Sequence, residues 1–188
     1  CAMDVAIRLA NIVCAISVIK GSKAFKENAD DLTLLVAEHT AFVAENYEDK
    51  GKFPNNHYLS DIAGVIFGSA FVVKTRQNAL FKKYLSDALE RLEGEVARQL
   101  NEDGSDYENS SYYHCFVTEL LCETVALLES NKISFSQSIK EKGVLVWKRK
   151  SLLSVVNLAV AAAPSGVRSL KRWESPFMTR SWWSRWRW

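Results

Sequence analysis

The sequence predicts an all-α protein, and three observations lead to this prediction. Its 188 residues include only 8 Gly and 3 Pro, the residue types that most often end helices or form turns. Apolar residues recur at helical spacing along most of the chain, and no segment is convincing as a strand. A hydrophobic content of 48% is typical of a globular protein with a core rather than of a disordered chain.

The first two predicted helices cover residues 3–20 and 29–47. Gly21 and Ser22 are expected to end the first helix, and a polar loop containing Gly51 and Pro54 follows the second. The first helix should be largely buried, because apolar residues occupy most of its faces. These residues are Val5, Ile7, Leu9, Ile12, Val13, Ile16 and Ile19.

The third and fourth predicted helices cover residues 57–73 and 76–101. The third is rich in small residues that permit close approach to another helix, namely Ala63, Gly64, Gly68 and Ala70. The fourth is amphipathic and charged. Its apolar side is formed by Leu80, Tyr84, Leu85, Leu89, Leu92 and Val96.

A second polar loop, residues 101–109, separates the fourth helix from a fifth at 110–129. A sixth helix is predicted from Ser134 to the region of Trp147. In an up-and-down array, the loops before residues 57 and 110 emerge at the same end of the molecule. We therefore look for a site assembled from these two loops.

Charge is divided unevenly along the chain. Eleven of the 24 Lys and Arg, but only two of the 22 acidic residues, lie from Lys140 onward, so residues 1–139 carry a net charge of −7. All six Trp also lie in this C-terminal part. Such a break suggests two segments of different origin or role, which we place at residues 1–140 and 141–188.

Several protein classes are excluded by simple features. The four Cys form no CxxC pair, so we expect buried reduced thiols rather than a disulfide framework. The longest apolar run, residues 152–163, is shorter than the roughly 20 residues that span a bilayer, so no transmembrane segment is expected. With no signal peptide, the chain is expected to begin inside a larger protein. Its localisation stays open: periplasmic or secreted if an export signal precedes it, cytoplasmic otherwise.

Two clusters of Asn, Tyr and His stand at predicted helix starts. The first, Asn55-Asn56-His57-Tyr58, begins the third helix, and the second, residues 106–114, begins the fifth. The pattern N-N-H-Y-L-x-x-x-x-G resembles the helix-start motif of heparinase II/III-type polysaccharide lyases. The later cluster resembles a second signature of that family through Asp103, Gly104, Glu108, Ser110, Tyr113 and His114.

The resemblance covers roughly residues 2–139. Residues 3–11 are similar to the family's preceding helix, and His39 falls where a family His is expected. Two ordered motifs about fifty residues apart are more specific than either motif alone.

The resemblance implies both a fold and a reaction. The fold is an incomplete (α/α) toroid of antiparallel helix pairs, and the reaction is β-elimination on a uronic-acid polysaccharide such as a glycosaminoglycan or alginate. The enzyme must neutralise the sugar carboxylate, remove the C5 proton and protonate the departing glycosidic oxygen. No cofactor is expected, and no metal site, because the three His lack the spacing of zinc ligands.

By resemblance, three residues take catalytic roles. Asn56 would donate a hydrogen bond to the developing enolate, and His57 matches a residue that some members use as the base. Tyr113 matches the catalytic Tyr, which acts as the acid and, for some stereochemistries, also as the base. Tyr112 replaces it if the alignment is shifted by one residue.

Substrate contacts are expected from Asn55, Tyr112, His114, Glu108, Arg8 and His39. Structural alternatives remain open for several candidates: Asn56 as a helix N-cap, Glu108 as a cap of the fifth helix, and Tyr112 with Tyr113 as core aromatics. His114 would orient its loop or contact substrate. His39 could equally be a packed helix residue, and Arg8 could form a structural ion pair.

After about residue 140 the resemblance ends. Family members continue with more helix pairs and a β-sandwich domain that supplies another catalytic His, so that domain would be missing here. We therefore expect a lyase fragment, inactive alone, whose partner is an acidic polysaccharide and not a nucleic acid. The alternative is a non-catalytic helical scaffold or carbohydrate-binding remnant.

Three interpretations of residues 141–188 remain. We favour an out-of-frame or misassembled end, because the expected continuation is replaced abruptly by sequence rich in Arg and Trp. The others are a membrane-surface or nucleic-acid segment and a packed terminal helix. We expect poor order from about residue 165.

Overall fold

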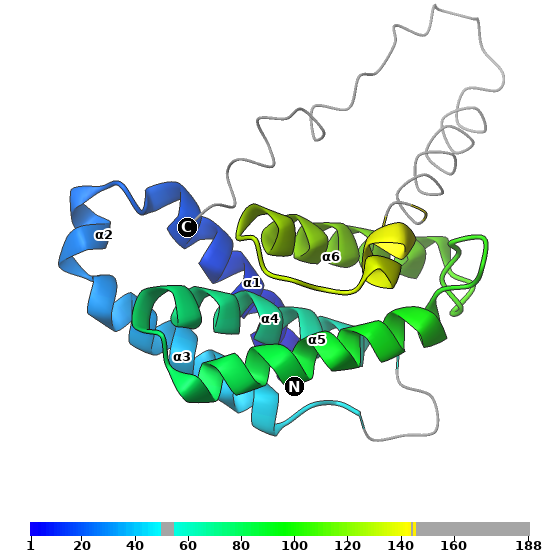
Figure 1. Cartoon of the computed structure of the whole chain (residues 1–188), viewed down its shortest axis with the longest axis horizontal. Helices are drawn as coiled ribbons and strands as arrows, with labels where there is room; N and C mark the ends of the chain where they lie inside the picture. The colour runs from blue at the N-terminus through cyan, green and yellow to red at the C-terminus, as the bar shows by residue number, and fades with distance from the viewer. Residues whose placement is uncertain (50–54, 144, 146–188) are drawn as a thin grey trace, which may run out of the picture.

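The structure, a computed structural model, describes residues 1–49, 55–143 and 145, and this part of the chain is built from α-helices (Figure 1). Only an isolated bridge, between Leu100 and Asp106, has β character in the described part. The all-α prediction is therefore confirmed. The helices are α1 (Ala2–Ile19), α2 (Lys23–Glu27), α3 (Ala29–Glu45), α4 (Asn56–Arg76), α5 (Ala79–Gln99) and α6 (Ser111–Ser130).

The short helix α2 was not predicted. Ser22, expected only to end the first helix, also starts the next one, because its hydroxyl accepts a hydrogen bond from the Phe25 N–H. The predicted start of the fourth helix at residue 76 is also wrong. Helix α4 continues to Arg76, Gln77 turns the chain with a φ of 51°, and the Asn78 side chain caps α5.

The sixth predicted helix begins at Gln137 rather than Ser134. Its expected extension to Trp147 lies outside the described residues. Residues 50–54 of the first polar loop, which include Gly51 and Pro54, also lie outside the described residues. So do residue 165, from which poor order was expected, and nearly all of segment 141–188.

Helix α4 is the centre of the fold and contacts α1, α3, α5 and α6. Every residue from Tyr58 to Val72 is buried. A Cβ added at Gly64 would lie 2.7 Å from the Cα of Ala6, and one at Gly68 would meet Thr40 and Leu9. The small residues therefore permit the close helix approach predicted from the sequence.

Helices α1 and α4 are long and apolar enough to cross a membrane by length and composition alone. For α4 this character has a simple structural cause, because 83% of the relevant window is buried inside the protein. For α1 the buried share is 39%, so the prediction that this helix is largely buried is wrong. Its buried residues Ala6, Leu9, Ala10, Val13 and Ile16 belong to the same core as those of α4.

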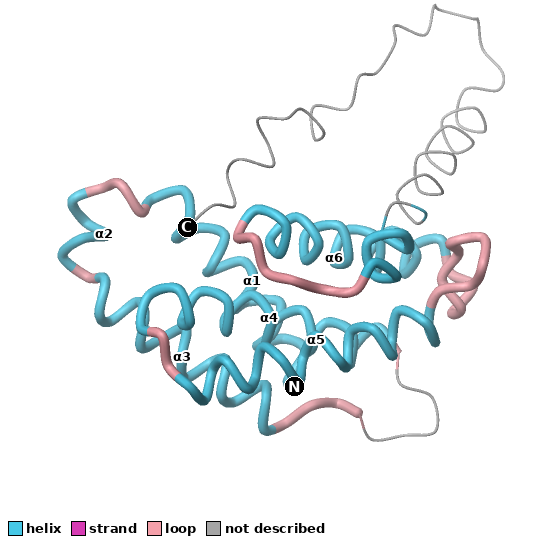
Figure 2. Tube along the Cα trace, viewed as in Figure 1, coloured by secondary structure: helices cyan, strands magenta, loops and turns pink. Residues whose placement is uncertain are grey.

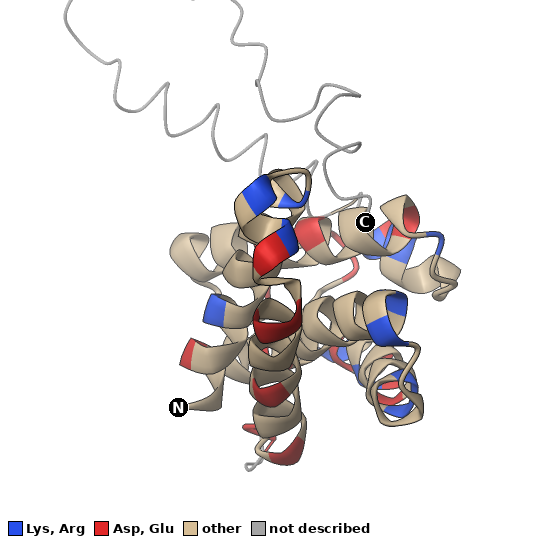
Figure 3. Ribbon diagram, turned by 90° about the vertical axis from the view of Figure 1, so that its left-hand side faces the viewer, with Lys and Arg blue, Asp and Glu red and all other residues tan. Residues whose placement is uncertain are grey.

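The connections that carry the two sequence motifs meet at one end of the bundle. Helices α4 and α5 join through a tight turn, so the connection between α5 and α6 returns to the end where α4 begins (Figures 1 and 2). Helix α3 contains Asp30, Asp31, Glu38 and Glu45 but no Lys or Arg, and a line of acidic residues runs down the central helix in the view of Figure 3.

Candidate functional site

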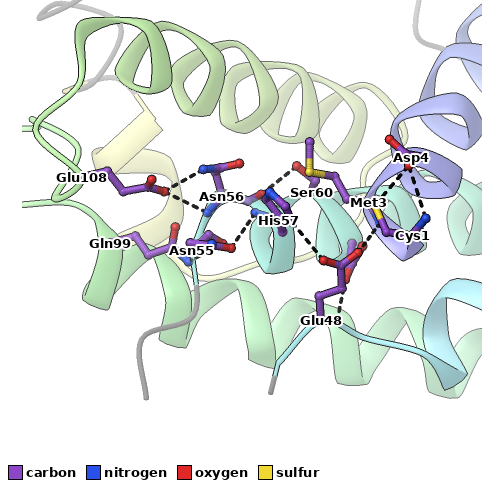
Figure 4. A network of polar contacts seen from close by, with 11 residues as sticks. Cys1, Met3, Asp4, Glu48, Asn55, Asn56, His57, Ser60, Gln99 and Glu108 are labelled. Carbon is purple, nitrogen blue, oxygen red and sulfur yellow. Dashed lines mark hydrogen bonds and ion pairs between the residues drawn. The ribbon is translucent and has the colours of Figure 1, made fainter. Parts of the chain in front are cut away.

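The two motifs are joined through Glu108 and Asn56. The backbone N–H and the side-chain Nδ2 of Asn56 both donate to Oε1 of Glu108, at 3.1 and 2.8 Å (Figure 4). Nearby, Nε2 of Gln99 donates to the backbone oxygen of Asn55 at 3.2 Å. The prediction that the two loops emerge at the same end is thus confirmed.

Asn56 itself is only 4% exposed. It is not the N-cap of α4: Asn55 holds that position, and its side chain accepts the His57 N–H at 3.1 Å. A side-chain amide has two N–H donors, and Glu108 engages Nδ2. The buried position and the existing partner restrict what else the Asn56 amide can bind.

His57 is paired with a carboxylate that the sequence analysis did not select. Its Nδ1 lies 2.9 Å from Oε2 of Glu48, while Oε1 of Glu48 accepts the Met3 N–H at 3.0 Å (Figure 4). The hydrogen bond from Met3, followed by that from His57, lowers the pKa of Glu48. The His57 side chain is 44% exposed, and that of Glu48 is 28% exposed.

Asp61 extends this network into the core. It is fully buried, and its Oδ2 accepts the backbone N–H of Glu48 at 2.7 Å. Burial raises the pKa of Asp61 to about 7, since a charged carboxylate loses solvation inside the protein. Asp61 is the single acidic residue of α4 and stands four positions after His57, and this sequence feature could have identified it.

Tyr112 and Tyr113 lie on the first turn of α6, where Ser110 caps the helix by accepting the Tyr113 N–H at 3.4 Å. The two residues are 77% and 40% exposed, and their rings meet edge to face with centroids 5.9 Å apart. The alternative that these are core aromatics is therefore wrong. Both phenols stand at the motif-bearing end of the bundle.

His114 is buried, and its Nδ1 accepts the backbone N–H of Asp106 at 3.3 Å. Of the two roles foreseen for His114, the geometry supports orienting the loop. Burial raises the pKa of Asp106 to about 6, and its Oδ2 accepts the Glu108 N–H at 3.3 Å. The loop before α6 is thus held in the shape that directs Glu108 toward Asn56.

The structure does not bring Arg8 or His39 to this network through any described contact. Arg8 is exposed on α1. The Nδ1 of His39 lies 2.9 Å from the backbone oxygen of Leu35 in its own helix, which favours the packed-helix interpretation. Among the described residues, no three His, Cys, Asp or Glu side chains are arranged to hold a metal ion.

Arg91 forms a second group beside the start of α4 that the sequence analysis also missed. Its Nη1 donates to the Tyr58 hydroxyl at 2.5 Å and lies 3.6 Å from Oδ2 of Asp49. Its guanidinium stacks over the Tyr47 ring at 4.6 Å from the centroid. Arg91 stands between Glu90 and Leu92, and no local feature of the α5 sequence distinguishes it.

Comparison with known proteins identifies the family of this chain. Residues 1–142 match the family described as the heparinase II/III N-terminus. A crystal structure of heparinase III shares 21% identity and a TM-score of 0.64, over 82% of this chain and 22% of that one. A heparinase III gene product with methylated lysines shares 19% identity and a TM-score of 0.61, over 80% of this chain and 23% of that one.

This chain therefore spans less than a quarter of the length of either solved structure. No curated protein matches it. The family match covers most of the sequence and includes both motifs, the whole of the described helical core and the network around Asn56. The chain belongs to the heparinase II/III N-terminus family.

Proposed function

We propose that this chain is the N-terminal part of a polysaccharide lyase that cleaves uronic-acid-containing glycans by β-elimination. The observation that carries the proposal is the pair of hydrogen bonds from Asn56 to Glu108, which unites the two motifs at one end of the bundle. We further propose that its helices form part of an (α/α) toroid of antiparallel pairs, with residues 1–140 as the toroid fragment and 141–188 outside it.

In the proposed reaction, a base removes the C5 proton of the uronic acid, and the electron pair passes into the sugar carboxylate as an enolate. The pair then returns to form the C4–C5 double bond as the bond to the glycosidic oxygen breaks. Asn56 donates to the enolate, His57 acts as the base, and Tyr113 protonates the departing oxygen. Tyr112 remains the alternative acid.

The proposed catalytic side chains differ in how accessible they are to a substrate. His57 and Tyr113 are both substantially exposed at the start of neighbouring helices. Asn56 is buried and holds Glu108, so it can serve the enolate only through its second N–H and only if substrate reaches it. Asn55, Glu108, Tyr112 and His114 complete the proposed surroundings, with Arg8 and His39 as more distant candidates.

A second candidate function follows from that burial. A non-catalytic helical scaffold, or a carbohydrate-binding remnant, would use the bond between Asn56 and Glu108 only to hold the two loops together. The low exposure of Asn56 is what this alternative explains directly.

Substitutions in a longer protein that contains this chain separate the two candidates. Asn56→Ala and Tyr113→Phe should each reduce formation of unsaturated uronate on heparan sulfate, alginate or glucuronan by a factor of about 100 or more, as expected on losing one transition-state hydrogen bond or the acid. Unchanged turnover in both variants, with folding retained, would support the scaffold instead.

The 188-residue chain alone should show little or no turnover in the same ultraviolet assay. The reason is that β-elimination in this proposal also needs the β-sandwich domain and the remaining helix pairs. Rapid turnover by the isolated chain would contradict the proposal that it is an incomplete enzyme.

A further inference from the structure

We propose that Glu48 is a positioning residue that holds His57 with the proton on Nδ1, so that Nε2 keeps the lone pair a base requires. The inference deepens the proposed function, because it rests on His57 acting as the base. It assigns a role to a carboxylate that lies outside both sequence motifs.

The first step concerns the charge of Glu48. Its Oε1 accepts the N–H of Met3 in the first turn of α1, where the unpaired N–H groups and the helix dipole stabilise an anion. This contact and the one to His57 favour the ionised form. An ionised carboxylate only accepts hydrogen bonds.

The second step concerns the ring. Since Oε2 of Glu48 only accepts, the 2.9 Å contact requires that Nδ1 of His57 carries the hydrogen. A neutral imidazole has a single N–H, so Nε2 is then unprotonated. The hydrogen bond at one nitrogen thus sets the state of the other.

The third step concerns rigidity. The backbone N–H of Glu48 donates to Oδ2 of the buried Asp61, which lies one turn after His57 on α4. Glu48 is therefore held by α1 through Met3, by α4 through Asp61, and by the ring itself. Its carboxylate is placed by two helices rather than by a free loop.

The two other His residues of the chain serve as internal references for the tautomer of His57. Nδ1 of His39 faces the Leu35 carbonyl and must donate, so neutral His39 is expected as the Nδ1–H tautomer. Nδ1 of His114 accepts the Asp106 N–H, so neutral His114 is expected as the Nε2–H tautomer. These are the only other His in the sequence, so each tautomer has one internal standard.

The experiment is long-range ¹H–¹⁵N correlation NMR on the full chain with ¹⁵N-labelled His, at a pH where the rings are neutral, with His57→Gln to assign the signal. His57 in the wild type should match His39 and differ from His114. In Glu48→Gln, the amide oxygen can keep the Met3 N–H while the amide nitrogen donates to Nδ1. His57 should then change from mainly Nδ1–H to mainly Nε2–H.

Asp49→Asn is the matched control. It removes a neighbouring carboxylate that pairs with Arg91 and makes no described contact with His57, so the His57 tautomer should not change. A wild-type His57 in the Nε2–H form would overturn the inference, and so would an unchanged tautomer in folded Glu48→Gln. If that variant does not fold, the wild-type spectrum alone decides.

The lyase assay tests a different statement. Absence of lyase activity in the longer protein, with the expected tautomers present, would remove the proposed function and leave the geometry of Glu48 and His57 intact. The reverse result, lyase activity with His57 in the Nε2–H form, would remove this inference and leave Tyr113 as the base.

Discussion

Glu108 accepts two hydrogen bonds from Asn56, and both end on the same oxygen, Oε1. Because Asn56 is almost fully buried, neither donor can easily exchange this partner for water. The pair therefore has a structural effect whether or not Asn56 also contacts a sugar. The stability of this junction between the two motif-bearing connections and the proposed chemistry therefore depend on the same two side chains, Asn56 and Glu108.

Glu108→Ala is expected to lower the free energy of unfolding by about 2 kcal/mol, because two buried donors lose their acceptor. Glu108→Gln should lose much less, since its amide oxygen can occupy the position of Oε1. Urea unfolding followed by circular dichroism measures both. Equal stability of Glu108→Ala and the wild type would show that the junction contributes little.

The helix α4 is the element on which the fold depends. Its glycines allow α1 and α3 to approach closely, because any larger residue would press against Ala6, Leu9 or Thr40. Its apolar residues are buried along nearly its whole length. Packing against α4 therefore determines where the first turns of α1 and α4 lie, and hence where Glu48 meets His57.

Gly64→Ala should destabilise the protein by about 1 kcal/mol or more, although Ala favours helices. The added methyl would overlap the backbone of Ala6, and such overpacking costs about 1–3 kcal/mol. Gly94→Ala in α5 is the control, because nothing lies within 4 Å of its added Cβ. That variant should gain about 0.5–1 kcal/mol. A similar gain in both variants, measured by thermal unfolding, would refute the close-packing argument.

At the scale of the whole molecule, the helical stretch that begins at Gln137 returns to the core. Ile139 is 1% exposed, and Nζ of Lys142 donates to the backbone oxygens of Leu100 and Asn101 at 3.2 and 2.8 Å. These contacts tie the last part of the family match, which ends at residue 142, to the connection between α5 and α6. Lys142, just past the proposed boundary at residue 140, therefore still contacts the connection between α5 and α6.

Two truncations test this boundary. A chain ending at residue 145 should unfold cooperatively, because it keeps Ile139 and Lys142. A chain ending at residue 136 should lose about 2–4 kcal/mol, the usual scale for removing one large buried aliphatic side chain. Denaturant unfolding compares them. Equal stability of the two truncated chains would place the end of the packed unit before residue 137.

Much of the helical pattern was predictable, because apolar periodicity and scarce Gly and Pro are local properties of the sequence. The ends of helices were less accurate. Ser22 follows the end of α1 by three residues and also caps the start of α2. Gln77 adopts a left-handed backbone conformation that the composition of the sequence does not indicate. Such ends depend on how the connected helices must turn to pack together.

By itself, the sequence determined the all-α class, the two motifs at helix starts and the expectation that their loops share one end. Only the tertiary structure decided that Asn56 is buried against Glu108, that Tyr113 is exposed, and that Glu48 reaches His57. The physical reason is that helical periodicity and the residues that favour a helix start are local properties of the sequence, even where packing moves the exact end. A hydrogen bond across nine or 52 positions exists only once packing has brought its two partners together.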